Sequence, residues 1–194
     1  YPEYVLHQMV TVMKGGEEVK ISKRAGSYVT LRDLIDDVGR DAVRWFFLMR
    51  KRDSQLDFDV DLARSQSEEN PVYYVQMAHA RVCGIFRVGE IDAAAFDAAG
   101  IDLSVLTATE ERELIKALAD FPSVVLSAAQ AMEPHRVTQY LLDAARLVHT
   151  WYHAHHVLGE PDPVRNARLV LARAAQVVIS NGLSILGISA PERM

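Results

Sequence analysis

Residues 134–154, PHRVTQYLLDAARLVHTWYHA, carry the most regular pattern in the chain. Apolar side chains recur there at alternating spacings of four and three residues, at Val137, Leu141, Ala144, Val148 and Trp151. This spacing gives a helix one continuous apolar face. Pro134 is tolerated at the start of a helix, because the N–H that it lacks needs no partner there. The stretch therefore predicts a long amphipathic helix in a helix bundle, with Trp151 in the core.

Two other stretches predict helices that pack with it. Asn70 and Pro71 join a good N-cap to a proline in the first turn, and the helix should continue through VYYVQMAHARVCGIFRV. Asp162 and Pro163 repeat the same signal. The helix after them is apolar on nearly all sides from Val170 onward, which is typical of a helix at the centre of a bundle.

The region between residues 90 and 134 is less regular. Residues 90–108 are rich in alanine and acidic side chains, and we expect a long solvated connection there. Thr107 and Glu110 have the spacing of a capping box, which predicts a helix start. Pro122 then predicts the beginning of a separate helix over PSVVLSAAQAM.

The first third of the chain has a different pattern. MVTVM and EEVKI alternate apolar and polar residues around KGG, which predicts two strands joined by a turn. Thr30 should cap a helix over LRDLIDDV, Gly39 should end it, and RDAVRWFFLMR should form the next helix. Residues 51–69 are polar and irregular, with a short helix near Leu62. We therefore predict a mainly α fold, with a small α/β unit over residues 1–68 and an antiparallel helix bundle over residues 69–194.

Composition narrows the class of protein. The 194 residues have 49% hydrophobic content, enough for a substantial core, and the apolar runs are shorter than the ~18 residues of a membrane span. The chain has one cysteine, Cys83, and its start lacks the features of a secretory signal, which favours a reducing cytoplasm and no membrane.

Charge is distributed unevenly. The net charge of −5 argues against a generally basic nucleic-acid binder, but residues 1–52 have a balance of +3 and residues 53–194 a balance of −8. The first third could therefore face an anion, whereas the remainder could bind a polyanion only through a local patch.

Residues 20–26, KISKRAG, concentrate three cations after the predicted turn. Ammonium groups on a loop that can close, such as those of Lys20 and Lys23, suit a triphosphate, because they neutralise charge that develops on a leaving pyrophosphate. The alternative is an ordinary solvated turn. The Gly-rich pattern GxxxxGK[ST] of a P-loop does not occur.

This stretch resembles the KMSKS signature loop of class I aminoacyl-tRNA synthetases. KxSKRxG is followed by VTLRDLIDDVGRDAVRWFFLMR, LDFDVDLA, NPVYYVQMAHAR and a terminal NGLSILGISAPERM. In that order these strings resemble arginyl-tRNA synthetase of the bacterial type. The resemblance implies the C-terminal end of a Rossmann-type catalytic domain, followed by a helical anticodon-binding domain.

The resemblance also implies roles for the loop. Lys20, Ser22 and Lys23 would hold the phosphates of ATP, and Lys20 and Lys23 would act in catalysis by stabilising pyrophosphate together with Mg²⁺. The whole enzyme would join arginine to tRNA-Arg, and tRNA would have to bind before the adenylate forms. The HIGH signature of the class is absent, and HAHH at 153–156 is no substitute. We therefore expect a C-terminal fragment that is monomeric and inactive by itself.

A second group of candidate residues lies on the helix after Asn70. Tyr74, Met77 and Arg81 are spaced i, i+3, i+7 and share one face. A tyrosine ring stacks on unpaired bases, and arginine stacks or grips phosphate. In related enzymes this face touches the anticodon loop, although Met77 replaces a second tyrosine. The resemblance also places Met194 near the anticodon arm. Without the resemblance, Tyr74 and Met77 would be interpreted as part of the core.

Three histidines on the late helices have the spacing of a metal site. His149, His153 and His156 lie at i, i+4 and i+7, but no cysteine or carboxylate converges with them in the sequence. We expect plain surface residues and no metal.

Two alternative functions stay open at this stage. Cysteinyl-tRNA synthetase has a related helical domain, although this chain lacks zinc-ligand cysteines. A non-catalytic helical interaction module that descends from a synthetase would share the fold without binding tRNA.

Overall fold

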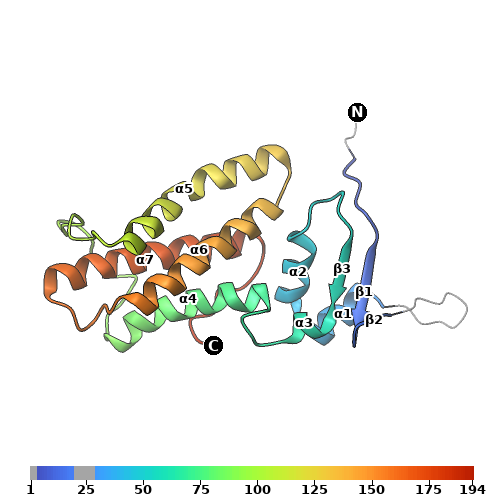
Figure 1. Ribbon diagram of the computed structural model, residues 1–194, viewed down its shortest axis with the longest axis horizontal. Coiled ribbons are helices and arrows are strands. Elements are labelled where there is room, and N and C mark those ends of the chain that lie inside the picture. The colour runs from blue at the N-terminus through green and yellow to red at the C-terminus, as the bar shows by residue number, and fades with distance from the viewer. Residues whose placement is uncertain (1–3, 20–28) are drawn as a thin grey trace, which may run out of the picture.

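Four long helices form a bundle at one end of the molecule, and a small α/β unit lies at the other end (Figure 1). The computed structural model describes residues 4–19 and 29–194. The bundle helices are α4 (Pro71–Val88), α5 (Thr109–Ala131), α6 (His135–Ala154) and α7 (Asp162–Ile185). The prediction of a mainly α fold with a small α/β unit in front of the bundle is confirmed.

The α/β unit contains a three-stranded sheet in the order β2-β1-β3. Strand β1 (Val10–Lys14) pairs antiparallel with β2 (Glu17–Glu18) and parallel with β3 (Leu56–Asp59). The sequence prediction missed β3, in which Leu56 and Phe58 point into the core and the aspartates point outward. This strand has only four residues, and its partner lies more than forty positions earlier in the chain.

The helices of this unit begin and end where local chemistry predicts. Thr30 caps α1 (Leu31–Val38), since its hydroxyl accepts a hydrogen bond from the N–H of Asp33. Gly39 lies between α1 and α2 (Arg40–Leu48) with a φ of 86°, a conformation that strains residues with a Cβ. A short helix, α3 (Val60–Arg64), occupies the predicted position near Leu62.

Helix α6 supplies the centre of the core. Its apolar stripe is buried as predicted, and Leu141, Val148 and Trp151 have no exposed surface. Helix α7 packs against α4, α5 and α6, as expected for a central helix, but its Val177 and Ile185 reach the surface. The prediction that α7 is enclosed on nearly all sides is therefore only partly right.

Helix α5 differs from the prediction in two ways. It is one continuous helix with Pro122 inside it, because Leu118 before the proline and Ala128 after it are both buried in the common core. Packing against α6 thus outweighs the lost hydrogen bond. The cap also lies one residue later than predicted, since Glu111 rather than Glu110 accepts a hydrogen bond from the N–H of Ala108.

By length and composition α5 could also cross a membrane, and only 17% of its most apolar window is buried. In this structure it packs on α6 and α7, with Leu114 in the core and Leu126 exposed on the outer side.

The two ends of the molecule are joined through the segment that follows α7. Arg44 of α2 donates a hydrogen bond to the carbonyl of Leu186 at 2.6 Å. Asp41 accepts hydrogen bonds from the N–H and the hydroxyl of Ser189, and from Gln76 of α4 at 3.1 Å. These contacts fix the direction in which the last residues run along α4.

We expect two helical glycines to respond with opposite sign to alanine. A Cβ at Gly182 of α7 would lie 2.6 Å from Cδ2 and 3.2 Å from Cγ of the fully buried Leu141, whereas a Cβ at Gly84 of α4 would meet only Arg87 at 3.5 Å. Alanine gains about 1 kcal/mol over glycine in a helix, but overpacking a core costs about 1–3 kcal/mol. Urea unfolding should therefore show that Gly84→Ala raises the free energy of unfolding and Gly182→Ala lowers it. Equal effects at the two positions would contradict this packing.

Candidate functional site

A groove of about 950 Å³ lies between α4, the end of α6 and the last residues of the chain. Helix α4 contributes Met77, Arg81, Gly84 and Arg87 to it. The opposite side comes from Tyr152 and His153 at the end of α6, from the loop His155–Gly159, and from Arg193 and Met194. Three arginines and an aromatic ring thus line one open concavity.

The spacing of residues along α4 explains how this groove forms. Met77, Arg81, Gly84 and Val88 recur at intervals of three and four, so they share one face of the helix. Gly84 has no side chain on that face, and the Arg87 guanidinium lies over it, with Nη2 3.5 Å from where a Cβ would be. The helix therefore presents the cations of Arg81 and Arg87 to the groove.

Tyr74 lies beside the groove rather than in it. Together with Met77, Arg81 and His149 it lines a smaller adjoining hollow of about 240 Å³. Its ring is half-buried and packs against the His149 ring, with 4.5 Å between the centroids, and burial raises the pKa of its hydroxyl. The Tyr74 ring is therefore partly packed against its neighbours and partly accessible from this hollow.

The other predicted residues are also near one another. Met77 and Arg81 line both hollows, and Met194, which is 50% exposed, lines the larger one. The structure therefore brings Tyr74, Met77, Arg81 and Met194 to one side of α4. Their role in binding stays a prediction. Lys20, Ser22 and Lys23 lie outside the residues that the structure describes.

The guanidinium of Arg81 is held by three side chains of α6. Its Nη1 lies 2.6 Å from Nδ1 of His149 and 3.2 Å from Nε2 of His153, and its Cζ lies 5.8 Å from the centre of the Tyr152 ring. Such contacts limit the orientations that a long side chain can adopt. Arg81 is thus held toward α6, at the edge of the groove, before any ligand arrives.

His149 is not the surface residue that its sequence position suggested. It is 7% exposed, and its Nε2 donates a hydrogen bond to the carbonyl of Tyr74 at 3.2 Å. Burial lowers the pKa of His149 below its usual 6.5, and the charge of Arg81 lowers it further. Among the described residues no cluster of histidine, cysteine and carboxylate side chains could hold a metal ion, so the structure offers none for this group.

The final residues of the chain are fixed along α4 by hydrogen bonds to their backbone. His79 donates to the carbonyl of Pro191 at 2.9 Å, Arg87 to that of Glu192 at 3.1 Å, and Gln76 to that of Ser189 at 3.0 Å. Met194 and Arg193 therefore reach the groove from a supported segment rather than a free tail.

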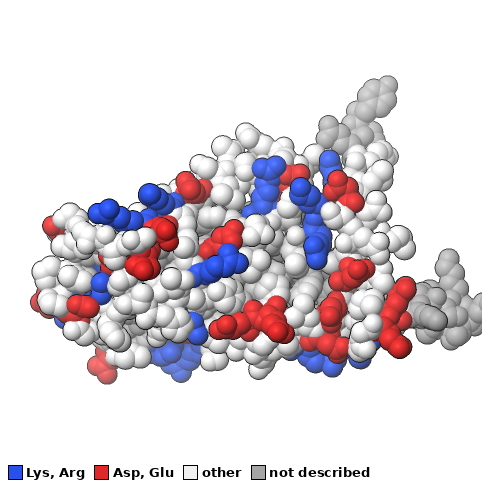
Figure 2. Space-filling view, in the orientation of Figure 1, with Lys and Arg blue, Asp and Glu red and all other residues white. Residues whose placement is uncertain are grey.

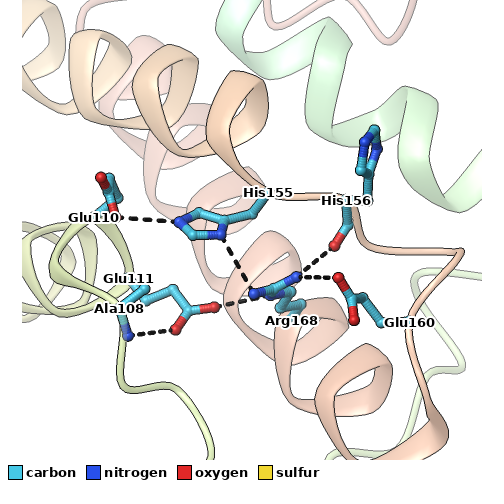
Figure 3. Close-up of polar contacts among 7 residues, drawn as sticks. All are labelled: Ala108, Glu110, Glu111, His155, His156, Glu160 and Arg168. Carbon is cyan, nitrogen blue, oxygen red and sulfur yellow. Dashed lines mark hydrogen bonds and ion pairs between the residues drawn. The ribbon is translucent and has the colours of Figure 1, made fainter.

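The loop after α6 is fixed by a buried ionic network, which Figure 3 shows around Arg168 of α7. Arg168 donates hydrogen bonds to Glu111 at 2.8 Å, to Glu160 at 3.0 Å and to the carbonyl of His156 at 2.7 Å. The side chains of Arg168 and Glu111 are only 12% and 2% exposed. One buried cation thus connects the start of α5 to the loop that forms a wall of the groove.

His155 extends this network to the surface. Its two ring nitrogens lie 3.3 Å from Arg168 and 3.2 Å from Glu110 (Figure 3). The pKa of the Glu110 carboxyl is lowered, chiefly by a hydrogen bond from its own backbone N–H at the start of α5. The His155 ring lowers it further. The wall of the groove is therefore supported by charges on α5 and α7.

Sequence reasoning found Met194 through the resemblance, but it missed Gly84 and Arg87 on α4 and the groove residues at the end of α6. Gly84 continues the spacing of Met77 and Arg81, and Arg193 is next to Met194, so both could have been found from the pattern. No local pattern places Tyr152 and His153 opposite Arg81, because that contact depends on how α4 and α6 pack.

The overall charge offers little general attraction for an anion. On the face shown in Figure 2, Lys and Arg side chains are interspersed with Asp and Glu side chains. The net charge of the chain is −5. Anion binding would therefore depend on local cations such as Arg81, Arg87 and Arg193.

Comparison with known proteins defines the class. Residues 75–194, which contain all but the first turn of the four-helix bundle and all residues that line the groove, match the DALR anticodon binding domain. The chain belongs to this family of anticodon-binding domains.

Within that class the whole chain is similar to arginine–tRNA ligases. It is 58% identical to the enzyme of Geobacter metallireducens and 55% identical to that of Bordetella petrii, with 100% of the chain and 35% and 34% of the relatives covered. The chain therefore spans about a third of the length of these relatives.

Solved structures agree with this similarity. The Thermus thermophilus arginyl-tRNA synthetase matches with a TM-score of 0.71 and 29% identity, over 95% of this chain and 34% of that one. A Campylobacter jejuni protein described as an arginyl-tRNA synthetase matches with a TM-score of 0.87 and 30% identity, over 97% and 40%. The resemblance predicted from the sequence is confirmed.

Breaking the network at Arg168 should be far more costly than breaking a surface ion pair. Arg168→Met leaves the Glu111 carboxylate buried without its cation, which costs about 3–5 kcal/mol of stability. The control Arg146→Met removes a pair with Asp143 in which the side chains are 66% and 52% exposed, and should cost less than about 1 kcal/mol. Urea unfolding at neutral pH measures both, and losses of similar size would rule out a structural role for the network.

Proposed function

We propose that the groove binds the unpaired bases of the anticodon arm of tRNA-Arg, within an arginine–tRNA ligase. The observation that carries this proposal is the position of Arg81, held between α4 and α6 in an open groove of an anticodon-binding domain. The 58% identity to an arginine–tRNA ligase favours arginine over cysteine as the amino acid.

The lining chemistry supports a single-stranded RNA loop as the ligand. Unstacked bases bind to aromatic rings and guanidinium planes, while phosphates bind to cations. Tyr152 offers a ring that is 40% exposed, Met77 and Met194 offer polarisable apolar contacts, and Arg81, Arg87 and Arg193 offer charge. Tyr74 can present only the exposed part of its ring, so it contributes less contact area.

For the longer protein we propose ATP-dependent ligation of arginine to tRNA-Arg, with two domains that meet near residue 68. Lys20, Ser22 and Lys23 hold the ATP phosphates, and Lys20 and Lys23 stabilise the departing pyrophosphate with Mg²⁺. A class I enzyme also needs a HIGH signature, which this chain does not contain. The 194 residues are therefore inactive alone, and we propose that they act as a cytoplasmic monomer.

Removing the charge of Arg81 should weaken RNA binding in a salt-dependent manner. Arg81→Met should reduce the affinity for a stem-loop RNA with the tRNA-Arg anticodon by about tenfold, and lower the slope of log affinity against log salt by about 1. The matched control Arg136→Met removes the same charge at the far end of α6, where Arg136 pairs with Glu133.

Fluorescence anisotropy at several salt concentrations measures both variants. The control should change the affinity by less than about twofold. Equal losses for the two arginines would mean that only net charge matters, and no binding to the RNA at all would indicate a module for protein interaction instead.

The phosphate-binding role of the loop can be tested in a longer protein that contains HIGH. Lys20→Ala combined with Lys23→Ala should slow the arginine-dependent exchange of pyrophosphate into ATP by about a hundredfold or more, when measured with tRNA-Arg present. Binding of the anticodon stem-loop should stay within about twofold, because these residues precede the bundle. If the double variant exchanged pyrophosphate as fast as the unmodified protein, the phosphate-binding role proposed for Lys20 and Lys23 would be wrong.

A further inference from the structure

We propose that His149 is a positioning residue for RNA binding: as a neutral acceptor it aims the Arg81 guanidinium into the groove, and its protonation releases that side chain. The inference deepens the proposed function and rests on it. It adds a pH-dependent element to the binding face of α4.

The hydrogen-bond pattern defines one tautomer. Nε2 of His149 faces the carbonyl of Tyr74 at 3.2 Å, and a carbonyl only accepts, so the ring proton must be on Nε2. Nδ1 then carries a lone pair, which faces Nη1 of Arg81 at 2.6 Å. A guanidinium only donates, so both contacts are satisfied by this single neutral form.

Protonation would make these contacts incompatible. An imidazolium has donors at both nitrogens, and its Nδ1–H would point at the N–H of Arg81 with two positive charges in contact. His149 is 7% exposed, so water can screen this repulsion only weakly. Arg81 is only half-buried and can swing away, whereas His149 is enclosed between α4 and α6.

The surroundings of His149 favour the neutral form overall. From α4 it faces Arg81 and the backbone and ring of Tyr74, from α6 it faces His153, and Glu68 precedes α4 nearby. Burial is the main cause that lowers the pKa of His149, Arg81 and His153 act in the same direction, and the Tyr74 carbonyl and Glu68 oppose them.

The direction of the pH dependence follows from that lowered pKa. The stabilising neutral form is fully present above the usual value of 6.5 and is lost as the pH falls through the lower folded-state value. The contribution of Arg81 to RNA binding should therefore be constant above pH 6.5 and decrease only as the pH falls below that value.

The test compares two substitutions of His149 that keep different halves of its hydrogen bonding. His149→Asn places an amide oxygen near the position of Nδ1 and keeps an acceptor for Arg81 that does not titrate. His149→Gln reaches the position of Nε2 and keeps the donor to Tyr74 instead. The chain with His149 and both variants all carry His153→Gln as well. No second histidine that contacts Arg81 then titrates in any of them.

The measured quantity is the loss of affinity caused by Arg81→Met, for the stem-loop RNA with the tRNA-Arg anticodon at constant ionic strength from pH 8 to pH 5. With His149 present, we expect a loss of about tenfold at pH 8 that shrinks by at least about threefold at pH 5. His149→Asn should keep the tenfold loss at every pH, and His149→Gln should show a small loss at every pH. Identical losses for Asn and Gln, or a loss that does not change with pH when His149 is present, would overturn the proposal.

A second measurement needs no RNA and separates this proposal from the proposed function. Nitrogen-15 spectra of the imidazole rings in the free chain should show His149 neutral, with its proton on Nε2, and Arg81→Met should raise its titration midpoint. If the chain did not bind the RNA, the proposed function would fail, and the spectra would still report on the contact between Arg81 and His149. A midpoint that is unmoved by Arg81→Met would show that His149 does not hold Arg81.

Discussion

Helix α6 packs against α4, α5 and α7 at the same time, and the rest of the structure depends on how its buried stripe meets them. Leu141, Val148 and Trp151 lie fully inside the core. Because the stripe fixes the rotation of α6, His149 and His153 must face Arg81 on α4. The same packing that stabilises the bundle therefore forms one side of the groove. The side chains that we propose to bind RNA lie at the edge of the core.

The other walls of the groove are held by polar contacts in addition to apolar packing, since Val157 of the loop after α6 and Ile188 of the last segment are buried in the core. Arg168 connects the loop after α6 to α5 through Glu111, and hydrogen bonds to backbone carbonyls fix the last residues of the chain along α4. A concave binding surface cannot be filled with apolar side chains without closing it. Buried charges with several partners can hold loops in place around an open space.

Much of the fold was predictable because it is decided locally. The caps at Thr30 and Asn70 and the buried stripe with Trp151 follow from the chemistry of a few neighbouring residues. Features decided by distant partners were not predictable: β3 exists because of β1, and Pro122 stays helical because α6 holds both halves of α5. The site likewise has a predictable and an unpredictable part. Tyr74, Met77 and Arg81 share a spacing that is visible in the sequence, whereas the burial of His149 depends on how α6 packs against α4.

The most direct test of the central claim, that the groove along α4 receives the anticodon loop, uses the methionines of the chain. Met77 and Met194 line the groove, whereas Met132 is 54% exposed beyond the end of α5, away from it. The carbon-13 methyl signals of methionine should be recorded while the tRNA-Arg anticodon stem-loop is added. The account predicts that Met77 and Met194 shift and Met132 does not; shifts confined to Met132, or no shift at Met77 and Met194 when the RNA is bound, would contradict it.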